Sequence, residues 1–288
     1  MTTPELLLSA WDWEPSVMIG CLALAIGYVL IVRKSAPACT AYFLGGLLLL
    51  LLDLVSPIDA LGDTYLFSAH VLQHFLLALI IPILLLLGMP AWVAETALKR
   101  RFLRQAESAI GHPPVSWALG VGTMLLWHVP VLFNAALAND ELHIFQHLSL
   151  LVTGTVFWWP VLTPLKENRT APLAAIVYLF SACTACSLLG ALLTFSAPGA
   201  YPDYLEPRDR LGVLQLIRAS WGLDAKSDQQ LGGMLMWVPG CFVYLSAILA
   251  NMARWYRMPE RAEMVHAPAG GRLKTDSLPS FAAALEKR

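Results

Sequence analysis

Charged residues are scarce in this sequence, and their scarcity excludes a soluble globular protein. Only 14% of the 288 residues are Asp, Glu, Lys or Arg, whereas about 25% is usual in a soluble domain. Hydrophobic residues make up 57% of the chain, and the mean hydropathy is +0.61. A chain of this composition is expected to bury its apolar surface in a lipid bilayer.

Other absences in the sequence narrow the range of possible functions. The formal net charge is −1, so the chain has no overall basic field that would hold nucleic acid. The five cysteines lie in or beside apolar runs, which is not the pattern of a secreted disulfide framework. The sequence contains no phosphate-binding glycine loop and no nucleophile motif with its base. We therefore expect a protein that is not an enzyme.

Long apolar runs predict an all-α, polytopic membrane protein with seven transmembrane helices. A helix needs about 20 apolar residues to cross a bilayer. The runs cover residues 16–32, 41–55, 65–87, 115–133, 142–162, 172–195 and 231–253. They predict a transmembrane domain over residues 1–257, with one sizeable outer loop at 196–230 folded over the helix ends. The charged, Pro- and Gly-containing tail at 258–288 is expected to be disordered and cytoplasmic.

Lysine and arginine predict the orientation, because they remain preferentially on the cytoplasmic side of a membrane. Fifteen of the 19 fall in one set of loops and in the C-terminal tail. The opposite set of loops contains only Arg208, Arg210, Arg218 and Lys226. The N-terminus is therefore expected outside and the C-terminus in the cytoplasm.

Five histidines within or at the edges of the predicted spans all fall in the outer half of the membrane. They are His70, His74, His128, His143 and His147. Ionisable groups at such positions are costly and indicate a function. Two pairs have i, i+4 spacing, so both rings of a pair share one helix face and can reach one ion.

The chemistry of these histidines favours metal binding without hydrolysis. Neutral imidazole binds copper, zinc, iron or nickel. Val71 and Ile144 follow the first histidine of each pair, where a zinc-protease motif requires Glu. The alternative is that the histidines only form hydrogen bonds between helices.

Other polar residues are candidates for the same site. Asp228 and Met236 lie at the start of the last span, and a thioether is a ligand that favours Cu(I). Core packing is the alternative for Met236. Asp53 and Asp59 are candidates for orienting an imidazole, although Asp59 could instead cap a helix or be solvated.

Two cysteines one helical turn apart, Cys183 and Cys186, invite a copper or redox interpretation. They are predicted near the middle of the membrane, deeper than the histidines. Buried packing is the favoured explanation for them, because free cysteine is among the most buried residue types.

Three motifs in order resemble a known family. They are SPIDALGDTYLFSAHVLQHFLL, WHVPVLFNAALANDELHIFQHLSLLVTGTVFWWPVL and DQQLGGMLMWVPG. Over residues 56–244 the chain is similar to the CtaG-type family of cytochrome c oxidase assembly factors, associated with caa-type oxidases. It departs from the family pattern at Gln146, where an acidic residue often precedes the histidine, and in having the Cys183–Cys186 pair.

The resemblance implies a copper-related role in maturing a haem-copper oxidase. The five histidines stand at the family's histidine positions, and Asp228 and Met236 fall in its last motif. The implied partners are cytochrome c oxidase subunits or another copper carrier, within the lipid bilayer of the bacterial inner (cytoplasmic) membrane. Assembly as a homo-oligomer is left open.

Three hypotheses follow for the function. The first is a membrane metallochaperone that takes copper at the outer face and supports its insertion into the oxidase. The second is a membrane cytochrome in which histidines of different helices, such as His74 and His147, ligate a haem b. The third is a copper permease, for which only Cys183, Cys186 and Met124 offer ligands further inward.

The distribution of Lys and Arg generates a prediction about topology. A reporter fused after Arg257 is expected in the cytoplasm, and one inserted near Asp203 is expected outside, because most basic residues lie on the side of Arg257. Paired alkaline phosphatase and fluorescent protein fusions measure this. Inverted signals would move the histidines to the cytoplasmic half.

Overall fold

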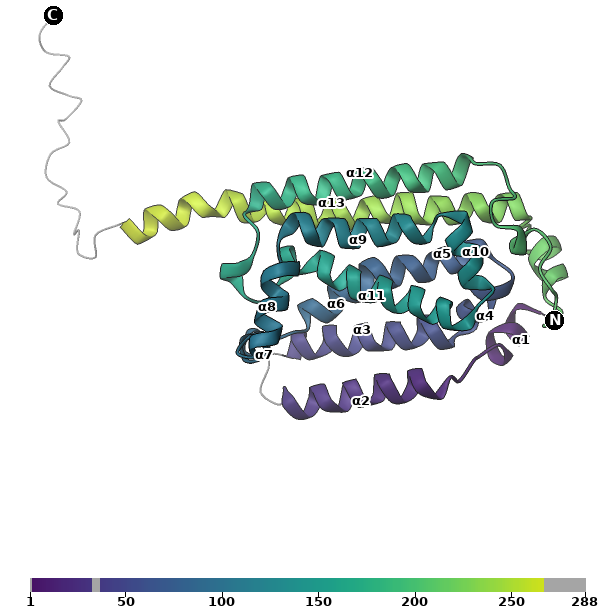
Figure 1. The fold of residues 1–288 in the computed structure, drawn as a ribbon, viewed down its shortest axis with the longest axis horizontal. Helices are drawn as coiled ribbons and strands as arrows, with labels where there is room; N and C mark the ends of the chain where they lie inside the picture. Colours follow the sequence, from purple (N-terminus) through teal and green to yellow (C-terminus); the bar gives the residue numbers. More distant parts are fainter. Residues whose placement is uncertain (1, 33–36, 267–288) are drawn as a thin grey trace, which may run out of the picture.

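The computed structural model describes residues 2–32 and 37–266, with side chains described as far as Arg257. These residues are helical, and no strand occurs among them, which confirms the all-α prediction (Figure 1). The elements are α1 (Thr3–Ser9), α2 (Pro15–Ile31), α3 (Pro37–Val55), α4 (Pro57–Thr64), α5 (Phe67–Phe75), η1 (Leu76–Ile80), α6 (Ile81–Leu87), α7 (Ala91–Leu98), α8 (Arg101–Ile110), α9 (Pro113–Trp127), α10 (Pro130–Leu137), α11 (Asp140–Leu162), η2 (Lys166–Asn168), α12 (Pro172–Phe195), η3 (Pro202–Tyr204), η4 (Leu216–Ser220) and α13 (Ala225–His266).

Proline determines where many of these helices begin. The fixed φ angle of proline suits the first helical position, where its missing N–H is not needed. Proline is the first residue of α2, α3, α4, α9, α10 and α12. The helix starts are therefore encoded locally.

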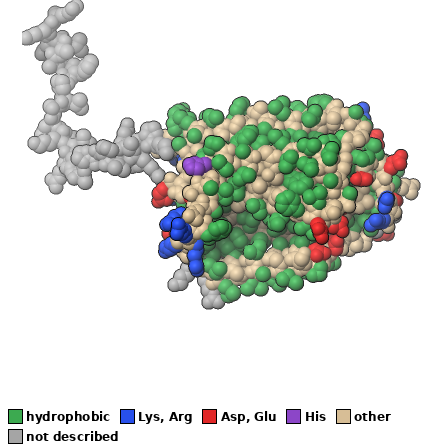
Figure 2. All heavy atoms as spheres, viewed as in Figure 1, with side chains coloured by type: hydrophobic (Ala, Val, Ile, Leu, Met, Phe, Trp, Pro, Cys, Tyr) green, Lys and Arg blue, Asp and Glu red, His purple; other side chains and the backbone are tan. Residues whose placement is uncertain are grey.

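The longer helices lie alongside one another and form a bundle (Figure 1). α12 packs most extensively on α13, and α11 packs on α9, α6 and η1. Hydrophobic side chains cover the face of the bundle seen in Figure 2. Large apolar side chains that are more than 60% exposed include Ile19, Val177, Phe180 and Phe242. Such a surface is that of a membrane protein.

Four helical segments are long and apolar enough to cross a membrane. They are Pro37–Val55, Phe67–Leu87, Pro172–Phe195 and Ala225–Arg257, and α9 with α10 would make a fifth, broken span. α2 is shorter, with 17 residues. α11 has 23 residues but contains polar residues in its first turns. The predicted seven spans are therefore not confirmed among the described residues, and seven remains a prediction.

The predicted fourth span, at residues 115–133, is broken. α9 ends at Trp127, α10 begins at Pro130, and the two helices meet at 72°. Proline disfavours helical backbone in the residue before it and lacks a donor for the preceding turn. The break therefore follows from Pro130 and leaves His128 at the bend.

The third span also departs from regular geometry. Between α5 and α6 the backbone forms the π-helical segment η1. Pro82 follows it and has no N–H to donate to the carbonyl four residues earlier, which is that of Ala78. A wider π turn accommodates such a missing bond, and π turns are frequent at functional sites.

Two predicted boundaries shift in the structure. α13 begins at Ala225, so the loop predicted at 196–230 is shorter and runs over residues 196–224. At the other end, α13 continues to His266, which makes the first part of the tail predicted at 258–288 helical. Residues 267–288 lie outside the described residues.

The bundle has two distinct ends. We call one the histidine end, where α5 begins and α10 and the 196–224 loop lie (Figure 1). The other, the basic end, contains α7 and α8 and their exposed residues Lys99, Arg100, Arg101 and Arg104. Figure 2 shows a group of Lys and Arg at this end.

Glycine allows the helices that contribute histidines to approach closely. A Cβ atom built on Gly154 of α11 would lie 2.9 Å from the Ala78 Cα of η1. Small residues at such contacts let membrane helices pack backbone to backbone. The close approach of α11 to the third span therefore depends on Gly154.

Gly154→Ala is expected to destabilise the protein by about 1–3 kcal/mol, because the added methyl group overpacks the contact and the backbone must shift to accommodate it. Gly122→Ala is the matched control, since a Cβ there would have nothing within 4 Å. The control should be neutral or slightly stabilising. Thermal unfolding of both variants in detergent measures the difference, and equal melting temperatures would contradict the packing argument.

Candidate metal centre

The start of α5 is held by a buried carboxylate from α13. Asp228 is 1% exposed. Its Oδ2 accepts a hydrogen bond from the Phe67 backbone N–H at 2.7 Å, and its Oδ1 accepts from the Ser68 N–H at 3.1 Å and from the Ser68 hydroxyl. These bonds satisfy N–H groups that a helix start leaves free. Asp228 therefore positions α5 and its histidines, and both of its oxygens are already engaged.

Gln73 joins α5 to the two preceding helices. Its Nε2 donates to the Asp53 backbone carbonyl at 3.0 Å and to Asp59 Oδ1 at 2.8 Å. In α4, outside the spanning helices, burial and the neighbouring Asp63 carboxylate raise the pKa of Asp59 to about 7. The Asp53 carboxylate is buried without a hydrogen-bond partner among the described residues. Among the described residues, neither the Asp53 nor the Asp59 carboxylate hydrogen-bonds to a histidine ring. The Asp59 carboxylate accepts from Gln73 instead and so orients that side chain.

The break between α9 and α10 orients the third histidine-bearing element. His128 Nδ1 lies 2.8 Å from the Met124 carbonyl oxygen. Because a carbonyl only accepts, Nδ1 bears the proton and Nε2 has the free lone pair. Tyr201, from the 196–224 loop, donates its hydroxyl to the His128 carbonyl at 2.7 Å. Its neighbour Tyr204 donates in the same way to the Gly62 carbonyl at 2.7 Å, so the loop covers the histidine end.

The structure brings all five predicted histidines into one cluster. We call His70, His74, His128, His143 and His147 the histidine cluster. His70 Nε2 and His74 Nε2 are 2.9 Å apart. Ring centroids are 5.1 Å apart for His74 and His128, 5.6 Å for His74 and His147, and 4.2 Å for His143 and His147. Rings from α5, α11 and the end of α9 therefore meet in one place.

Four of the five rings of the cluster are buried. His70 and His74 are 0% exposed, His128 is 3% exposed and His147 is 8% exposed. Phe133 of α10, itself fully buried, lies 4.7 Å from His70 between ring centroids. The bend at His128 turns α10 across the cluster, so the same break supplies both a histidine and its cover.

Several ring nitrogens in the cluster have no hydrogen-bond partner within the described part of the chain. They are His70 Nδ1, His74 Nδ1, His128 Nε2, His143 Nε2 and His147 Nε2. A buried polar atom without a partner is costly and requires an explanation. Where such a nitrogen carries a lone pair, a bound ion would use it.

The spacing of the nitrogens suits an ion. Metal–imidazole bonds of about 2.0–2.1 Å place the ligand atoms of one ion about 3–4 Å apart. One ligand atom from each of His70, His74 and His147 lies within 4.8 Å of the others, and the same holds for Asp63, His70 and His143. Small movements of side chains would bring either group onto one ion.

Asp63 is a candidate residue that sequence reasoning missed. It lies near the end of α4, and its Oδ1 is 3.6 Å from His143 Nε2. The only signal in the sequence is that Asp63 is an acidic residue in a short connection before a histidine pair. Asp59, Asp140 and Glu141 also precede a histidine pair, so the proximity of Asp63 to His143 could not be inferred.

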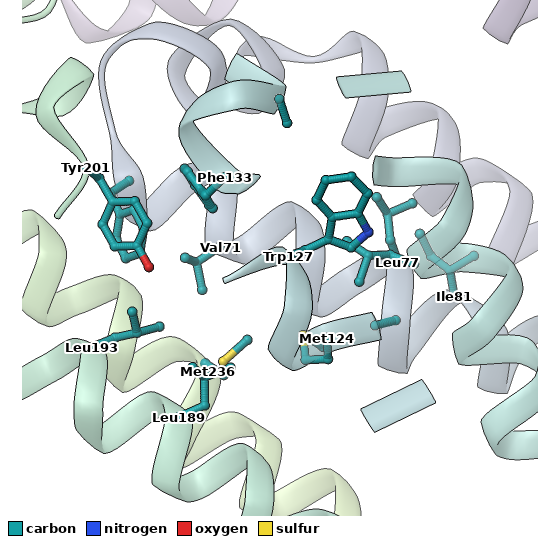
Figure 3. Close-up of a cluster of buried hydrophobic side chains, with 14 of the residues drawn as sticks. Val71, Leu77, Ile81, Met124, Trp127, Phe133, Leu189, Leu193, Tyr201 and Met236 are labelled. Carbon is teal, nitrogen blue, oxygen red and sulfur yellow. The ribbon is translucent and has the colours of Figure 1, made fainter. Parts of the chain in front are cut away.

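The other predicted residues take part in packing between helices. Met236 is 3% exposed and belongs to an apolar cluster with Met124 and Leu189 (Figure 3). Cys183 Sγ lies 3.8 Å from Cys241 Sγ in α13, and Cys186 Sγ lies 3.5 Å from the Tyr244 hydroxyl. The two cysteines of the pair thus contact α13 and pack between helices.

Comparison with known proteins gives one family. The family model described as cytochrome c oxidase caa3 assembly factor (Caa3_CtaG) matches residues 25–258. An uncharacterized protein of Mycobacterium leprae is 25% identical over 276 residues, and one of Mycobacterium bovis is 24% identical over 279 residues. Each match covers 88% of this chain and 40% of the relative. The chain therefore spans about two fifths of the length of these curated relatives. No solved structure matches the chain significantly.

Asp228→Ala is expected to lower the free energy of unfolding by about 2–5 kcal/mol, because it leaves buried N–H groups of α5 without acceptors. Asp224→Ala is the matched control. Asp224 Oδ1 accepts from the Ser227 N–H at 2.7 Å at the exposed start of α13, where water can replace it. Thermal unfolding in detergent should show a large loss for the first variant and a small loss for the second; similar losses would contradict the anchoring role.

Proposed function

The chain belongs to the cytochrome c oxidase caa3 assembly factor family, and from this premise we propose that it binds copper in the histidine cluster and supports copper insertion into the oxidase. Copper is then cargo, held for transfer to another protein. The proposed activity is that of a metallochaperone, with no reaction catalysed on the chain. Its proposed partners are the oxidase subunits or another copper carrier.

The buried nitrogens without partners are the observation that supports copper binding. Five imidazoles in an apolar shell provide more lone pairs than hydrogen bonds use. Copper stands at the top of the affinity order of divalent metals for such ligands, and imidazole also suits it by type. A metal ion would therefore relieve the cost of the unsatisfied nitrogens.

The proposed topology places the cluster toward the outer face of the bacterial inner membrane. α2 and α11 lie in the bundle beside the other long helices (Figure 1) and would complete seven spans. The four exposed basic residues at the basic end favour a cytoplasmic position for that end. The histidine end would then face the outside.

A haem b is the alternative ligand, and the packing of the rings argues against it. His74 and His147 would have to ligate the iron from opposite sides. The His70 ring centroid lies 4.5 Å from that of His74 and 5.6 Å from that of His147. A porphyrin between the two ligands would overlap His70 and the covering Phe133.

A copper permease is favoured by one observation. A cavity of about 10 Å³ lies between the histidine cluster and the basic end, lined by Met124, Cys186 and Tyr244 among others. Among its lining residues, Met124 has a thioether and Cys186 has a thiol, and both groups are ligands for Cu(I). Its volume is that of about one water molecule, so it offers a single position and no continuous path, and we retain the metallochaperone as the proposal.

His74→Ala is expected to lower the copper bound per protein by at least about half while the protein remains folded, because a metal depends on each ligand whereas the fold depends on the whole bundle. Copper is measured by mass spectrometry after equilibration with a copper buffer and removal of free ion. The control is His112→Ala, an exposed histidine at the start of α9. Unchanged copper content with reduced stability would show a structural histidine instead.

Deletion of the gene is expected to give membranes with oxidase polypeptides present and oxidase activity low. Added copper should partly restore that activity, because copper at high concentration can occupy imidazole-rich sites without help. His74→Ala should behave as the deletion does. Oxidase activity and copper content of membranes are measured across a copper series. Normal activity in the deletion at limiting copper would overturn the assembly role proposed for this chain.

A further inference from the structure

His70 belongs to two different groups of metal-binding atoms. In the deep group it lies with His74 and His147, and in the outer group it lies with Asp63 and His143. Within each group the ligand atoms are within 4.8 Å of one another. The two groups therefore adjoin and share one imidazole.

Exposure differs sharply between the two groups. The Asp63 side chain is 39% exposed and that of His143 is 16% exposed. His70 and His74 are 0% exposed, and His147 is 8% exposed. An ion arriving from water would reach the Asp63 carboxylate before any buried imidazole.

The two groups also differ in chemistry. A carboxylate is a hard oxygen ligand that accepts a hydrated divalent cation, whereas three imidazoles form a neutral nitrogen site. Asp63 Oδ1 and His143 Nε2 are 3.6 Å apart, and that nitrogen has no hydrogen-bond partner among the described residues. Hydrogen bonding within the protein therefore leaves this nitrogen free to bind an ion.

We propose that Asp63, His70 and His143 form an outer copper site, from which the ion passes to the deep site of His70, His74 and His147. This inference rests on the proposed copper-binding function. In the transfer, the bonds to Asp63 and His143 break as those to His74 and His147 form, and the His70 imidazole is a ligand at both sites. No electron is transferred, so the oxidation state of the ion does not change. A shared ligand keeps the ion bound at every stage of the passage.

The proposal separates the rate of copper uptake from the amount bound. Without the Asp63 carboxylate, the ion must enter the buried site directly, so Asp63→Asn should slow uptake of Cu(II) on the order of tenfold. The equilibrium content of the deep site should stay near that of the wild type. Uptake is followed by rapid mixing of the full-length protein in detergent with a Cu(II) buffer, and content is measured by mass spectrometry.

Asp140→Asn is the matched control, because it removes the same charge from an exposed position at the start of α11. Both variants weaken the negative field at the histidine end, but only one removes a ligand of the outer site. Slow uptake in Asp63→Asn alone supports the proposal. Equal rates in the two variants would overturn it.

A second measurement isolates the outer site. The double variant His74→Ala with His147→Ala removes two ligands of the deep site and should retain a reduced amount of Cu(II), with nitrogen and carboxylate ligands in its electron paramagnetic resonance spectrum. Adding Asp63→Asn should abolish that signal. Loss of all copper from the double variant, with copper bound by the wild type, would overturn the outer site alone. A wild-type protein that binds no copper would overturn the proposed function as well.

Discussion

The hydrogen bonds from the first N–H groups of α5 to the buried Asp228 carboxylate join the third span to the last one. Within a membrane no water replaces such bonds, so they determine where α5 begins and how it is rotated. The positions of His70 and His74, and of Gln73 with its bonds to α3 and α4, follow from that rotation. The placement of two rings of the cluster thus depends on a carboxylate whose two oxygens both accept hydrogen bonds from α5.

Four of the five rings of the histidine cluster are at most 8% exposed, and their hydrogen bonding among the described residues is nevertheless incomplete. Stability alone would favour a partner for every buried nitrogen. The lone pairs left free among the described residues are suited to a ligand that binds reversibly. Some stability is therefore given up at the histidine end, as is common at functional sites.

Irregular backbone is concentrated next to the cluster. The bend at His128 turns Phe133 over the rings, and the π-helical segment η1 begins two residues after His74, at Leu76. Both departures have a proline as their cause, at Pro130 and Pro82. The break at Pro130 thus brings both His128 and Phe133 to the cluster.

Much of this architecture was determined by the sequence alone, because its causes are local. Apolar runs specify membrane helices, prolines specify their starts, and i, i+4 spacing places two histidines on one helix face. Which faces of different helices meet is decided only by tertiary packing, such as the contact of Gly154 with Ala78. For that reason Asp63 was missed beside His143, and Asp228 proved to hold the start of α5. Contacts between helices have no period along the chain, so only the packed bundle defined them.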